Sequence, residues 1–534
     1  MSEYCVVGSG PAGVACAKAL LDSGARVRML DAGLTLEADK TGLIRKLAAS
    51  SPEQWSQADQ KAYKAGMNPD VGGVPLKLVY GSDFAYRDVS ETLGLSYDDV
   101  GVRPSFALGG LSNVWGAAMM PYAASDLTDW PITRDALAPH YTAVLDFAGL
   151  AARADDLESE FPLFTKNLTR LDLSSQSRYL LDRMQKSRAR LLAAGMLFGC
   201  SRLAVLGNHE SGAGGCVYCR LCMYGCPYDL IYNSAHTVAC LQKQPEFTYE
   251  PGVVVSSVRE VLGGVEIFGQ RHPTREPLTW RADRVFLAAG VIPTTQILLK
   301  SLGAYDQPVM LKDSQYFLLP MLTRRIRGAS SERSFGLSQL FVELFDPEGP
   351  ARTTHVQIYT TNDLMNDAVA NAFGPLRNVL GFLVRNLQER LVLAQGFLHS
   401  DYSSRIEVKL CPAAAGQEEK LTLRGVVNPD SADAVRKTVR RLARHARQLG
   451  LRPLTPALKL ANPGRSFHCG GSFPMSKTPR GMETDLLGRP PGWSRLHAVD
   501  SSVFPAIPAT TITLSAMANA HRIGCEVQRL DENP

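Results

Sequence analysis

The first thirty residues alternate between strand-like and helix-like patterns of apolar positions. The β-branched run at 5–7 ends at Gly8 and predicts a buried strand. A proline then suits the first turn of a helix, and apolar residues follow it at helical spacing, namely Val14, Ala17, Leu20 and Leu21. A second apolar run, at 26–30, ends at Asp31. The pattern predicts a strand–helix–strand unit at the start of the chain.

The rest of the chain carries further patterns of both kinds. Residues 284–299 read as a buried strand, a glycine turn and a helix, and residues 248–268 read as paired strands. Residues 353–360 and 404–411 alternate between apolar and polar positions, which predicts strands of a second sheet. A helix is expected to begin near Thr513, with Leu514, Met517 and Ile523 on one face.

Two segments have an amphipathic helical pattern. Residues 376–398 are apolar with charged interruptions, and we expect a buried amphipathic helix there, with contact to a membrane surface as the alternative. Residues 433–449 have an apolar face, and much of the remainder is basic through Arg436, Lys437, Arg440, Arg441, Arg444 and Arg447. This basic surface is either a solvated helix face or a docking surface for an acidic redox partner or substrate.

Composition narrows the class of protein. The 534 residues exceed what one hydrophobic core usually organises, so two or more lobes are expected. Apolar residues make up 45% and charged residues 20%, and a net charge of +5 is too dilute to indicate nucleic-acid binding. We expect no transmembrane segment, because no uncharged apolar window is long enough. The chain enters a strand at once, without a signal-peptide pattern, so we expect a cytoplasmic protein.

The N-terminal unit has the glycine spacing of a dinucleotide site. Gly8, Gly10 and Gly13 form G-x-G-x-x-G between the first strand and the helix. Glycines let the backbone approach a pyrophosphate, and the helix N-terminus supplies N–H groups for it. Asp31 stands at the end of the second strand, where a carboxylate can accept hydrogen bonds from a ribose diol. This unit alone does not separate FAD from NAD.

Three later segments identify a family resemblance. They are LGGLSNVWG at 108–116, the strand–turn–helix at 284–299, and LHAVDSSVFPAIPATTITLSAMANAHRIGCEV at 496–527. Together with the glycine motif, and in this order, they resemble the glucose–methanol–choline (GMC) family of FAD-dependent oxidoreductases over nearly the whole chain. The resemblance implies an α/β fold with a Rossmann-like FAD-binding lobe and a second, sheet-based α+β substrate lobe.

The expected lobes are discontinuous in sequence. We assign residues 1–145, 201–300 and 462–534 to the FAD-binding domain, and residues 146–200 and 301–461 to the substrate-binding domain. A cysteine-rich loop, 214–229, interrupts the first of these.

The resemblance implies a set of FAD contacts beyond the glycine motif. A helix N-terminus near Thr513 could hold negative charge on a reduced flavin. The segment Ser112-Asn113-Val114-Trp115 has no histidine where some relatives attach the flavin covalently, so we expect FAD to be bound non-covalently. The expected cofactor-binding residues outside the N-terminal unit are Gly110, Ser112, Asn113, Trp115, Val254, Gly290, Asp500 and Ser501.

The resemblance also implies alcohol or sugar oxidation with a histidine base. Such chemistry takes a proton from the hydroxyl while hydride passes to flavin N5, and an imidazole suits the proton transfer. His468, in SFHCGGSFPMS, occupies the family's base position. Thr511 stands where the family usually has Asn or His, so this chain keeps only a hydroxyl there. Two other functions remain open: a tailoring oxidase or desaturase of a biosynthetic intermediate, and a non-catalytic flavin or iron–sulfur electron-transfer subunit.

Four of the eleven cysteines lie in the loop, at Cys216, Cys219, Cys222 and Cys226. Their spacing, followed by Pro227, is that of a bacterial ferredoxin run. A single copy provides three ligands for a three-iron cluster, or needs a further thiol such as Cys200 or Cys240 to complete a four-iron cluster. Zinc usually needs a second knuckle, and some relatives have a cysteine-rich segment here for which no cluster should be assumed. A cluster would pass electrons to an external acceptor, either a quinone or a partner protein. Without one, the flavin would be reoxidised directly.

Overall fold

The computed structural model confirms the N-terminal strand–helix–strand unit. Strand β1 (Glu3–Val7) leads into helix α1 (Pro11–Asp22), and β2 (Arg26–Leu30) follows in parallel register with Val6 opposite Met29. The structure describes residues 3–66, 70–71, 74–208, 214–345, 352–413 and 419–532. The predicted domain ranges also include the intervening residues, which lie outside this description.

A five-stranded parallel sheet forms around β1, in the order β24-β13-β1-β2-β9. Its outer members come from distant parts of the chain: β9 (Phe247–Glu250), β13 (Arg284–Leu287) and β24 (Leu496–Ala498). Strands β1 and β13 are almost entirely buried, as expected for parallel strands covered on both faces. All five strands direct their carboxyl ends toward one edge, where ligands bind in parallel α/β sheets.

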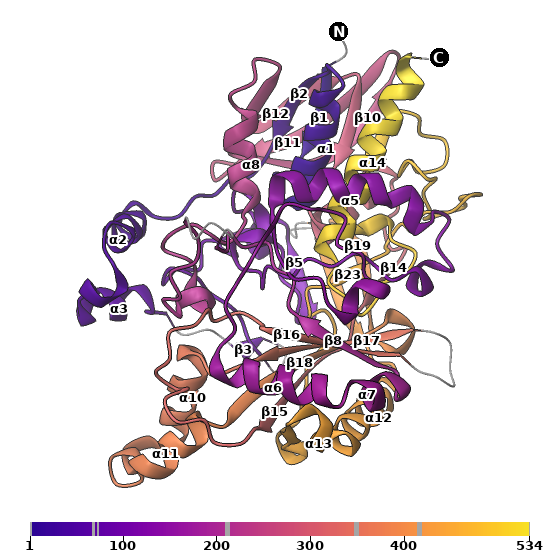
Figure 1. The fold of residues 1–534 in the computed structure, drawn as a ribbon. Coiled ribbons are helices and arrows are strands. Elements are labelled where there is room, and N and C mark those ends of the chain that lie inside the picture. The colour runs from indigo at the N-terminus through magenta and orange to yellow at the C-terminus, as the bar shows by residue number, and fades with distance from the viewer. Residues whose placement is uncertain are drawn as a thin grey trace.

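The C-terminal helix α14 (Thr513–Glu532) returns to the start of the chain and packs on α1 (Figure 1). The helices approach closely at Gly524, where an added Cβ would lie 3.0 Å from Ala19 Cβ. Helix α5 (Arg134–Ala148) packs on α14, and α9 (Val291–Ser301) packs on β10. The predicted paired strands are confirmed as part of an antiparallel sheet of β10 (Val253–Val261), β11 (Gly264–Arg271) and β12 (Pro277–Ala282).

A seven-stranded sheet forms the second large layer, below the first in Figure 1. Neighbouring strands are antiparallel, and along them side chains point alternately to two faces. Val356 and Ile358 on β17 belong to a core beneath the sheet, whereas Gln357 and Tyr359 line a cavity above it. The strands are β8 (Met196–Cys200), β15 (Tyr316–Leu322), β16 (Leu340–Phe345), β17 (Thr353–Tyr359), β18 (Leu391–Leu398), β21 (Arg452–Pro453) and β22 (Lys459–Leu460).

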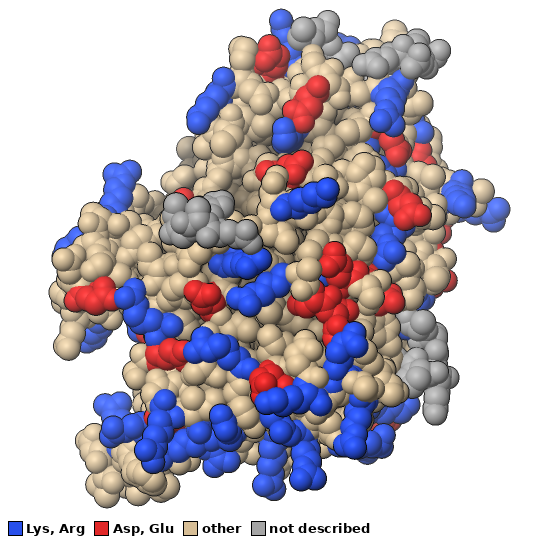
Figure 2. All heavy atoms as spheres, in the orientation of Figure 1, with Lys and Arg blue, Asp and Glu red and all other residues tan. Residues whose placement is uncertain are grey.

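Helices cover the far face of this sheet. Apolar residues of α6 (Ser175–Lys186), α7 (Arg188–Ala193) and α12 (Asp430–Arg444) join the core beneath it. The predicted helix at 433–449 is confirmed, with a break at His445 before α13 (Ala446–Leu449). Its basic residues are exposed except Arg441, which donates to the backbone oxygens of Ala194 and Phe345. Lys and Arg gather along this lower side of the molecule in Figure 2.

The expectation of one buried amphipathic helix over 376–398 is wrong. The segment divides into a short 3₁₀ helix at Gly374–Asn378, helix α11 (Gly381–Gln388) and strand β18. Only Val384 of α11 is buried. The apolar run therefore combined an exposed helix with a buried strand, two elements that hydrophobicity alone does not separate.

A third sheet, ordered β23-β14-β19-β20-β5, lies between the two layers. Its strands are β5 (Leu95–Asp98), β14 (Val309–Asp313), β19 (Arg405–Cys411), β20 (Lys420–Val426) and β23 (Cys469–Gly470). The remaining helices are α2 (Ala38–Ala48), α3 (Gln57–Tyr63), α4 (Val89–Thr92), α8 (Ser234–Leu241) and α10 (Asp363–Phe373), and the remaining strands are β3 (Asp70–Val71), β4 (Val74–Pro75), β6 (Leu150–Ala151) and β7 (Leu168–Thr169). The fold is thus mixed α/β, and the predicted division into two domains stays a prediction.

None of the helices in the described part of the chain combines the length and the apolar character that a membrane span requires.

Candidate active site

A cavity of about 660 Å³ is lined by residues from the parallel sheet and from the seven-stranded sheet. Its volume falls in the range of small-molecule and cofactor sites. Most of the sequence-predicted site residues line it: Gly8, Gly10, Asp31, Gly110, Ser112, Trp115, Val254, Gly290, His468, Asp500, Ser501 and Thr511. Residues separated by up to five hundred positions therefore meet around one space.

At one end of the cavity the wall is formed by the backbone of several glycines. Gly8 ends β1 with φ +102°, a conformation that favours glycine. Gly10 precedes α1, and an added Cβ there would meet nothing within 4 Å, so it would extend into open space. Gly110 approaches Gly10 closely, and a Cβ added to Gly110 would lie 3.4 Å from Gly10 Cα. A glycine-lined gap at a helix N-terminus fits a pyrophosphate.

Asp31 borders the same end and is already engaged by neighbours. Its carboxylate accepts hydrogen bonds from Ser9 Oγ at 2.5 Å and from Tyr249 OH at 3.0 Å. Burial raises the pKa of Asp31 to about 6, and the hydrogen bonds from Ser9 and Tyr249 oppose that rise. A ribose diol would add donors to this carboxylate, which fits the predicted role.

Two predicted cofactor-binding residues do not line the cavity. Gly13 faces the strand side, where an added Cβ would lie 2.0 Å from Gly8 O, so this glycine permits close packing of helix and strand. Asn113 is folded back on its own loop: its amide donates to the carbonyl oxygens of Leu108 and Gly110, and its Oδ1 accepts from Asn233. Sequence position alone did not reveal these orientations.

The C-terminal motif supplies the far wall of the nucleotide end. Asp500 Oδ2 accepts from Gly290 N at 3.0 Å and from Thr294 Oγ1 at 2.6 Å, which ties the end of the last parallel strand to the start of α9. Burial raises the pKa of Asp500 above its usual range. Thr513 lines the cavity where α14 begins, so the positive end of that helix lies at the cavity wall.

His468 lies at the other end of the cavity, directly before β23. The preceding residue, Phe467, has φ +60°, which is uncommon for a bulky side chain. The imidazole stacks on Phe397, with ring centroids 4.9 Å apart and planes inclined by 25°. Its Nδ1 is buried and has no hydrogen-bond partner among the described residues.

Electrostatics keeps His468 neutral. Burial, with a smaller contribution from the nearby His355, lowers the pKa of His468 to about 3. A neutral imidazole is the form that can accept a proton, and negative charge brought beside it would raise the pKa toward neutrality.

A buried carboxyl group positions the loop before His468. Gly464 N and Ser466 Oγ both donate to Asp313, and the His468 N–H donates to Ser466 Oγ at 2.9 Å. Burial raises the pKa of Asp313 to about 7, with these donors opposing the rise. Asp313 ends β14 beside β23, so the third sheet carries both the imidazole and its support.

Thr511 also lines the cavity, and its hydroxyl is partly occupied. Its Oγ1 accepts from the Met120 backbone N–H at 3.2 Å. The hydroxyl hydrogen remains able to donate one bond. This geometry suits an orienting role better than a proton-accepting one.

The floor of the cavity is formed by residues of the seven-stranded sheet, and the sequence analysis did not predict these residues as part of the site. Gln357 and Tyr359 of β17 and Gln395 of β18 present polar groups there, beside Leu393 and Phe397. Tyr359 OH donates to Gln357 Oε1, and Gln357 contacts His355, which pairs with the buried Glu343. The alternating pattern predicted the strands but did not indicate which face a substrate would meet.

Two cations in the cavity wall were also missed. Lys77 is half-buried and donates to the Trp115 carbonyl oxygen at 2.8 Å, and desolvation lowers the pKa of Lys77 to about 8. Arg465 is buried nearby and donates to backbone oxygens of Val74 and Pro75. A single lysine within the apolar stretch VPLKLVY was the only sequence signal for the first of these.

The cysteine-rich loop adjoins the cavity. Met223 lines it, and Cys222 is buried close enough to Lys77 for their charges to interact. Burial raises the pKa of Cys216 to about 12 and that of Cys226 to about 11, and the other loop thiols add repulsion. The four thiols therefore form one electrostatically coupled group next to the cavity.

Each loop sulfur accepts a backbone N–H. Gly336 N donates to Cys222 at 3.3 Å, and Tyr218 N and Leu230 N donate to Cys216 and Cys226 at 3.4 and 3.5 Å. The backbone N–H of Leu221 donates to Cys219. Such donors stabilise thiolate ligands of iron–sulfur clusters. Among the residues described, no three of these sulfurs lie within 4.8 Å of one another, so they do not form the compact tetrahedron of a zinc site, whose edges are roughly 3.8 Å.

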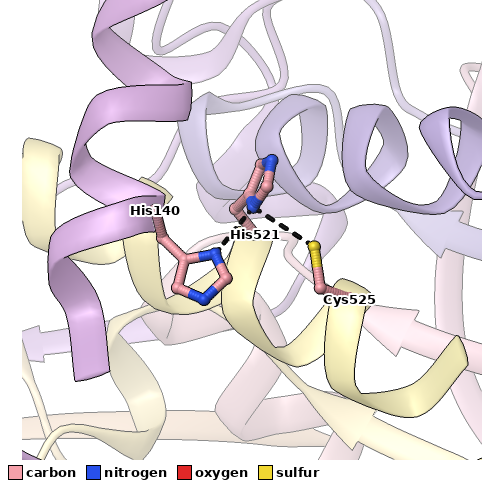
Figure 3. Close-up of side chains that lie close together, drawn as sticks. All are labelled: His140, His521 and Cys525. Atoms are coloured by element: carbon pink, nitrogen blue, oxygen red, sulfur yellow. Dashed lines mark hydrogen bonds between the residues drawn. The ribbon is translucent and has the colours of Figure 1, made fainter. Parts of the chain in front are cut away.

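One other group of ligand-type side chains lies outside the cavity. Figure 3 shows His140 of α5 beside His521 and Cys525 of α14. The Nδ1 atoms of the two histidines are 2.9 Å apart, and Cys525 Sγ is 3.5 Å from His521 Nδ1. Burial lowers the pKa of His140 to about 4, and the neighbouring His521, Arg522 and Arg529 lower it further. Because these arginines oppose a further cation, we interpret the group as a hydrogen-bonded contact between two helices.

Comparisons with known proteins place this geometry in a fold. No family model matches the chain, and no curated protein matches it by sequence. Among solved structures, pyridoxine 4-oxidase from Mesorbium loti is similar, with a TM-score of 0.59 and 14% identity over 99% of each chain. At this identity the likeness concerns the fold alone. It confirms the structural side of the resemblance drawn from the sequence: the chain has the fold of a GMC-type oxidoreductase.

Proposed function

We propose that the protein is an FAD-dependent oxidoreductase that removes hydride from a CH–OH group of an alcohol or sugar-like substrate. One observation carries the proposal: His468, neutral and with an unpartnered nitrogen, shares a single cavity with the glycine-lined gap and Asp31. A base and a nucleotide site in one cavity is the arrangement that such chemistry needs.

The residues at the cradle fit FAD held without a covalent bond. Gly10 leaves open space for the pyrophosphate beside the N-terminus of α1, and Gly8 and Gly110 allow the chain to pack closely around it. Asp31 would take the ribose. Val254, Gly290, Asp500, Ser501, Ser112 and Trp115 would complete the contacts. Bound FAD would supply a two-electron acceptor for hydride at its N5 atom.

The other side chains of the cavity would have separate roles in alcohol oxidation. His468 would take the hydroxyl proton, and Asp313 would act through Ser466 as a positioning residue. Thr511 would donate one hydrogen bond to orient the substrate oxygen. Gln357, Tyr359 and Gln395 would bind further hydroxyl groups, which favours a polyhydroxylated substrate over a purely apolar alcohol.

The test is flavin bleaching under anaerobic conditions with a panel of alcohols, sugars and lipophilic hydroxy compounds. Loss of the oxidised flavin absorbance with at least one hydroxyl compound is expected. If none of the panel reduces the flavin while dithionite does, the non-catalytic electron-transfer function is favoured instead. A second panel holds compounds without a CH–OH group. Reduction by that second panel alone would favour the desaturase alternative, for which the partly occupied Thr511 hydroxyl is the supporting observation.

We also propose that Cys216, Cys219, Cys222 and Cys226 hold a three-iron or four-iron cluster. Support comes from the ferredoxin spacing, the backbone N–H groups at the sulfurs and the position beside the cavity. Such a cluster would carry single electrons from the flavin to an external acceptor.

Iron analysis and absorbance of anaerobically purified protein test the cluster. Broad absorbance near 400 nm that survives flavin removal and is lost in Cys222→Ser, but not in Cys411→Ser, is expected. Flavin bands alone, with iron below one equivalent, would contradict it.

A further inference from the structure

A short helical segment exposes an unusual amount of apolar surface. Of the nine large hydrophobic side chains that are exposed in the described residues, four fall between positions 376 and 383. Their exposed fractions are 59% for Leu376, 82% for Val379, 66% for Phe382 and 52% for Leu383. Contiguous exposed apolar residues of this kind mark an interaction surface.

The segment projects from the molecule instead of lying in a groove. Helices α10 and α11 pack on each other and extend away from the seven-stranded sheet, at the lower end of Figure 1. Gln388 of α11 donates to the backbone oxygen of Asn366 in α10, which fixes the pair. The apolar side chains therefore stand on a convex tip.

Cations surround this tip. Arg377 and Arg385 are exposed within the segment, and Arg325 lies over the Phe382 ring at 5.3 Å from its centroid. No acidic residue occurs between 374 and 388, and the adjoining Glu389 is buried in an ion pair with Arg325. We call Leu376, Arg377, Val379, Phe382, Leu383 and Arg385 the α11 patch.

The basic surface continues beyond the α11 patch. The outward residues of α12 and α13 include Arg436, Lys437, Arg440, Arg444 and Arg447, all exposed. Figure 2 shows Lys and Arg along this whole lower side, with few acidic residues among them. A protruding apolar tip beside a broad cationic face is typical of a surface that rests on an anionic bilayer.

We propose that the α11 patch and the basic face of α12 bind the surface of an anionic phospholipid bilayer. Val379 and Phe382 enter the boundary between headgroups and acyl chains, and the arginines contact the lipid phosphates. Charge complementarity selects this occupant, because apart from Asp430 and Asp433 in the first turn of α12 the charged side chains of the α11 patch, α12 and α13 are all basic, and the tip is convex. Leu364, Met365 and Ala368 of α10 also line the cavity, so α10 connects the α11 patch to the cavity wall.

Vesicle flotation with the full-length, flavin-loaded protein tests the proposal. The protein is mixed with phosphatidylcholine vesicles, with or without about one third phosphatidylglycerol, at low and high salt. We expect binding to the anionic vesicles that weakens as salt increases. Absence of binding to anionic vesicles at low salt would overturn the proposal.

Matched variants distinguish the contribution of the apolar side chains to vesicle binding from that of the arginines. The double variant Val379→Glu/Phe382→Glu should bind at least about tenfold more weakly, whereas Leu262→Glu, at a 99% exposed position far from the patch, should bind like the wild type. Arg377→Glu/Arg385→Glu should also lose binding, with Lys243→Glu as its control. Flavin content and circular dichroism confirm that each variant is folded.

Two outcomes would contradict the proposal in these variants. One is unchanged vesicle binding by Val379→Glu/Phe382→Glu. The other is a wild-type dimer in light scattering that this double variant converts to a monomer, which would assign the α11 patch to an interface between two copies of the chain.

Discussion

The two ends of the cavity are built in different ways. The nucleotide end is built from residues of short contiguous motifs, with Gly8 and Gly10 only two residues apart and the carboxylates of Asp31 and Asp500 at its border. The substrate end consists of side chains from separate strands, among them Gln357, Gln395 and His468. The first can be recognised in sequence because its geometry is local. The second exists only after distant strands pair.

Each of the two ends holds a buried ionisable group, and the pKa values of the two groups are shifted in opposite directions. Burial raises the pKa of Asp31 to about 6 and lowers the pKa of His468 to about 3. In both cases the uncharged form is favoured, because a charge in either place would be desolvated.

The largest effect is expected at the substrate end. His468→Ala should retain FAD but slow flavin reduction at least about 100-fold, as for loss of a general base. Anaerobic stopped-flow absorbance with a substrate found by the bleaching panel measures this rate. His236→Ala, at a half-exposed position outside the cavity lining, serves as the control. An unchanged single-turnover rate in His468→Ala would remove this histidine from the mechanism.

A pair of glycine variants sharpens the comparison at the nucleotide end. Gly10→Ala adds a Cβ that meets no protein atom within 4 Å and extends into the cradle, so FAD affinity should fall about tenfold or more with stability unchanged. Gly13→Ala adds a Cβ 2.0 Å from Gly8 O, so it should lower the free energy of unfolding by about 1–3 kcal/mol. Flavin titration and urea unfolding measure the two. Equal effects on affinity and stability in both variants would contradict the separation of roles.

The pH dependence of apoprotein stability should differ between the ends. His468 has a lowered native pKa, so as pH falls below about 6.5 the unfolded state binds its proton first and wild type loses stability relative to His468→Gln. Asp31 has a raised native pKa, so as pH rises from about 4 to 6 the unfolded state releases its proton first and wild type loses stability relative to Asp31→Asn. Each difference should reach ~1 kcal/mol in urea unfolding. Parallel curves for wild type and variant would refute the assigned shift.

The smallest effect is expected at Thr511. Thr511→Val keeps the shape but leaves the Met120 N–H without its acceptor, which should cost about 1 kcal/mol of stability. Turnover should fall less than tenfold, since the hydroxyl orients the substrate without taking its proton. Steady-state kinetics and thermal unfolding check both quantities. A loss of turnover as large as that of His468→Ala would instead make Thr511 part of the proton-transfer step.

The sequence by itself determined the features that depend on local order. The strand–helix–strand unit, the glycine spacing, the start of α14 near Thr513 and the resemblance to a GMC-type fold were all legible, because each lies in a short contiguous motif. The N–H groups of a helix N-terminus and the small size of glycine act over a few residues, so spacing is enough to predict them.

Tertiary structure decided everything that depends on which face of an element meets which space. It turned Asn113 onto its own loop, placed Lys77 and Met223 in the cavity wall, and chose the face of β17 that a substrate would meet. It also left the apolar side of α11 exposed where the pattern indicated burial. Periodicity gives the spacing of side chains along an element, but the direction in which they point is fixed only when sheets and helices pack against one another.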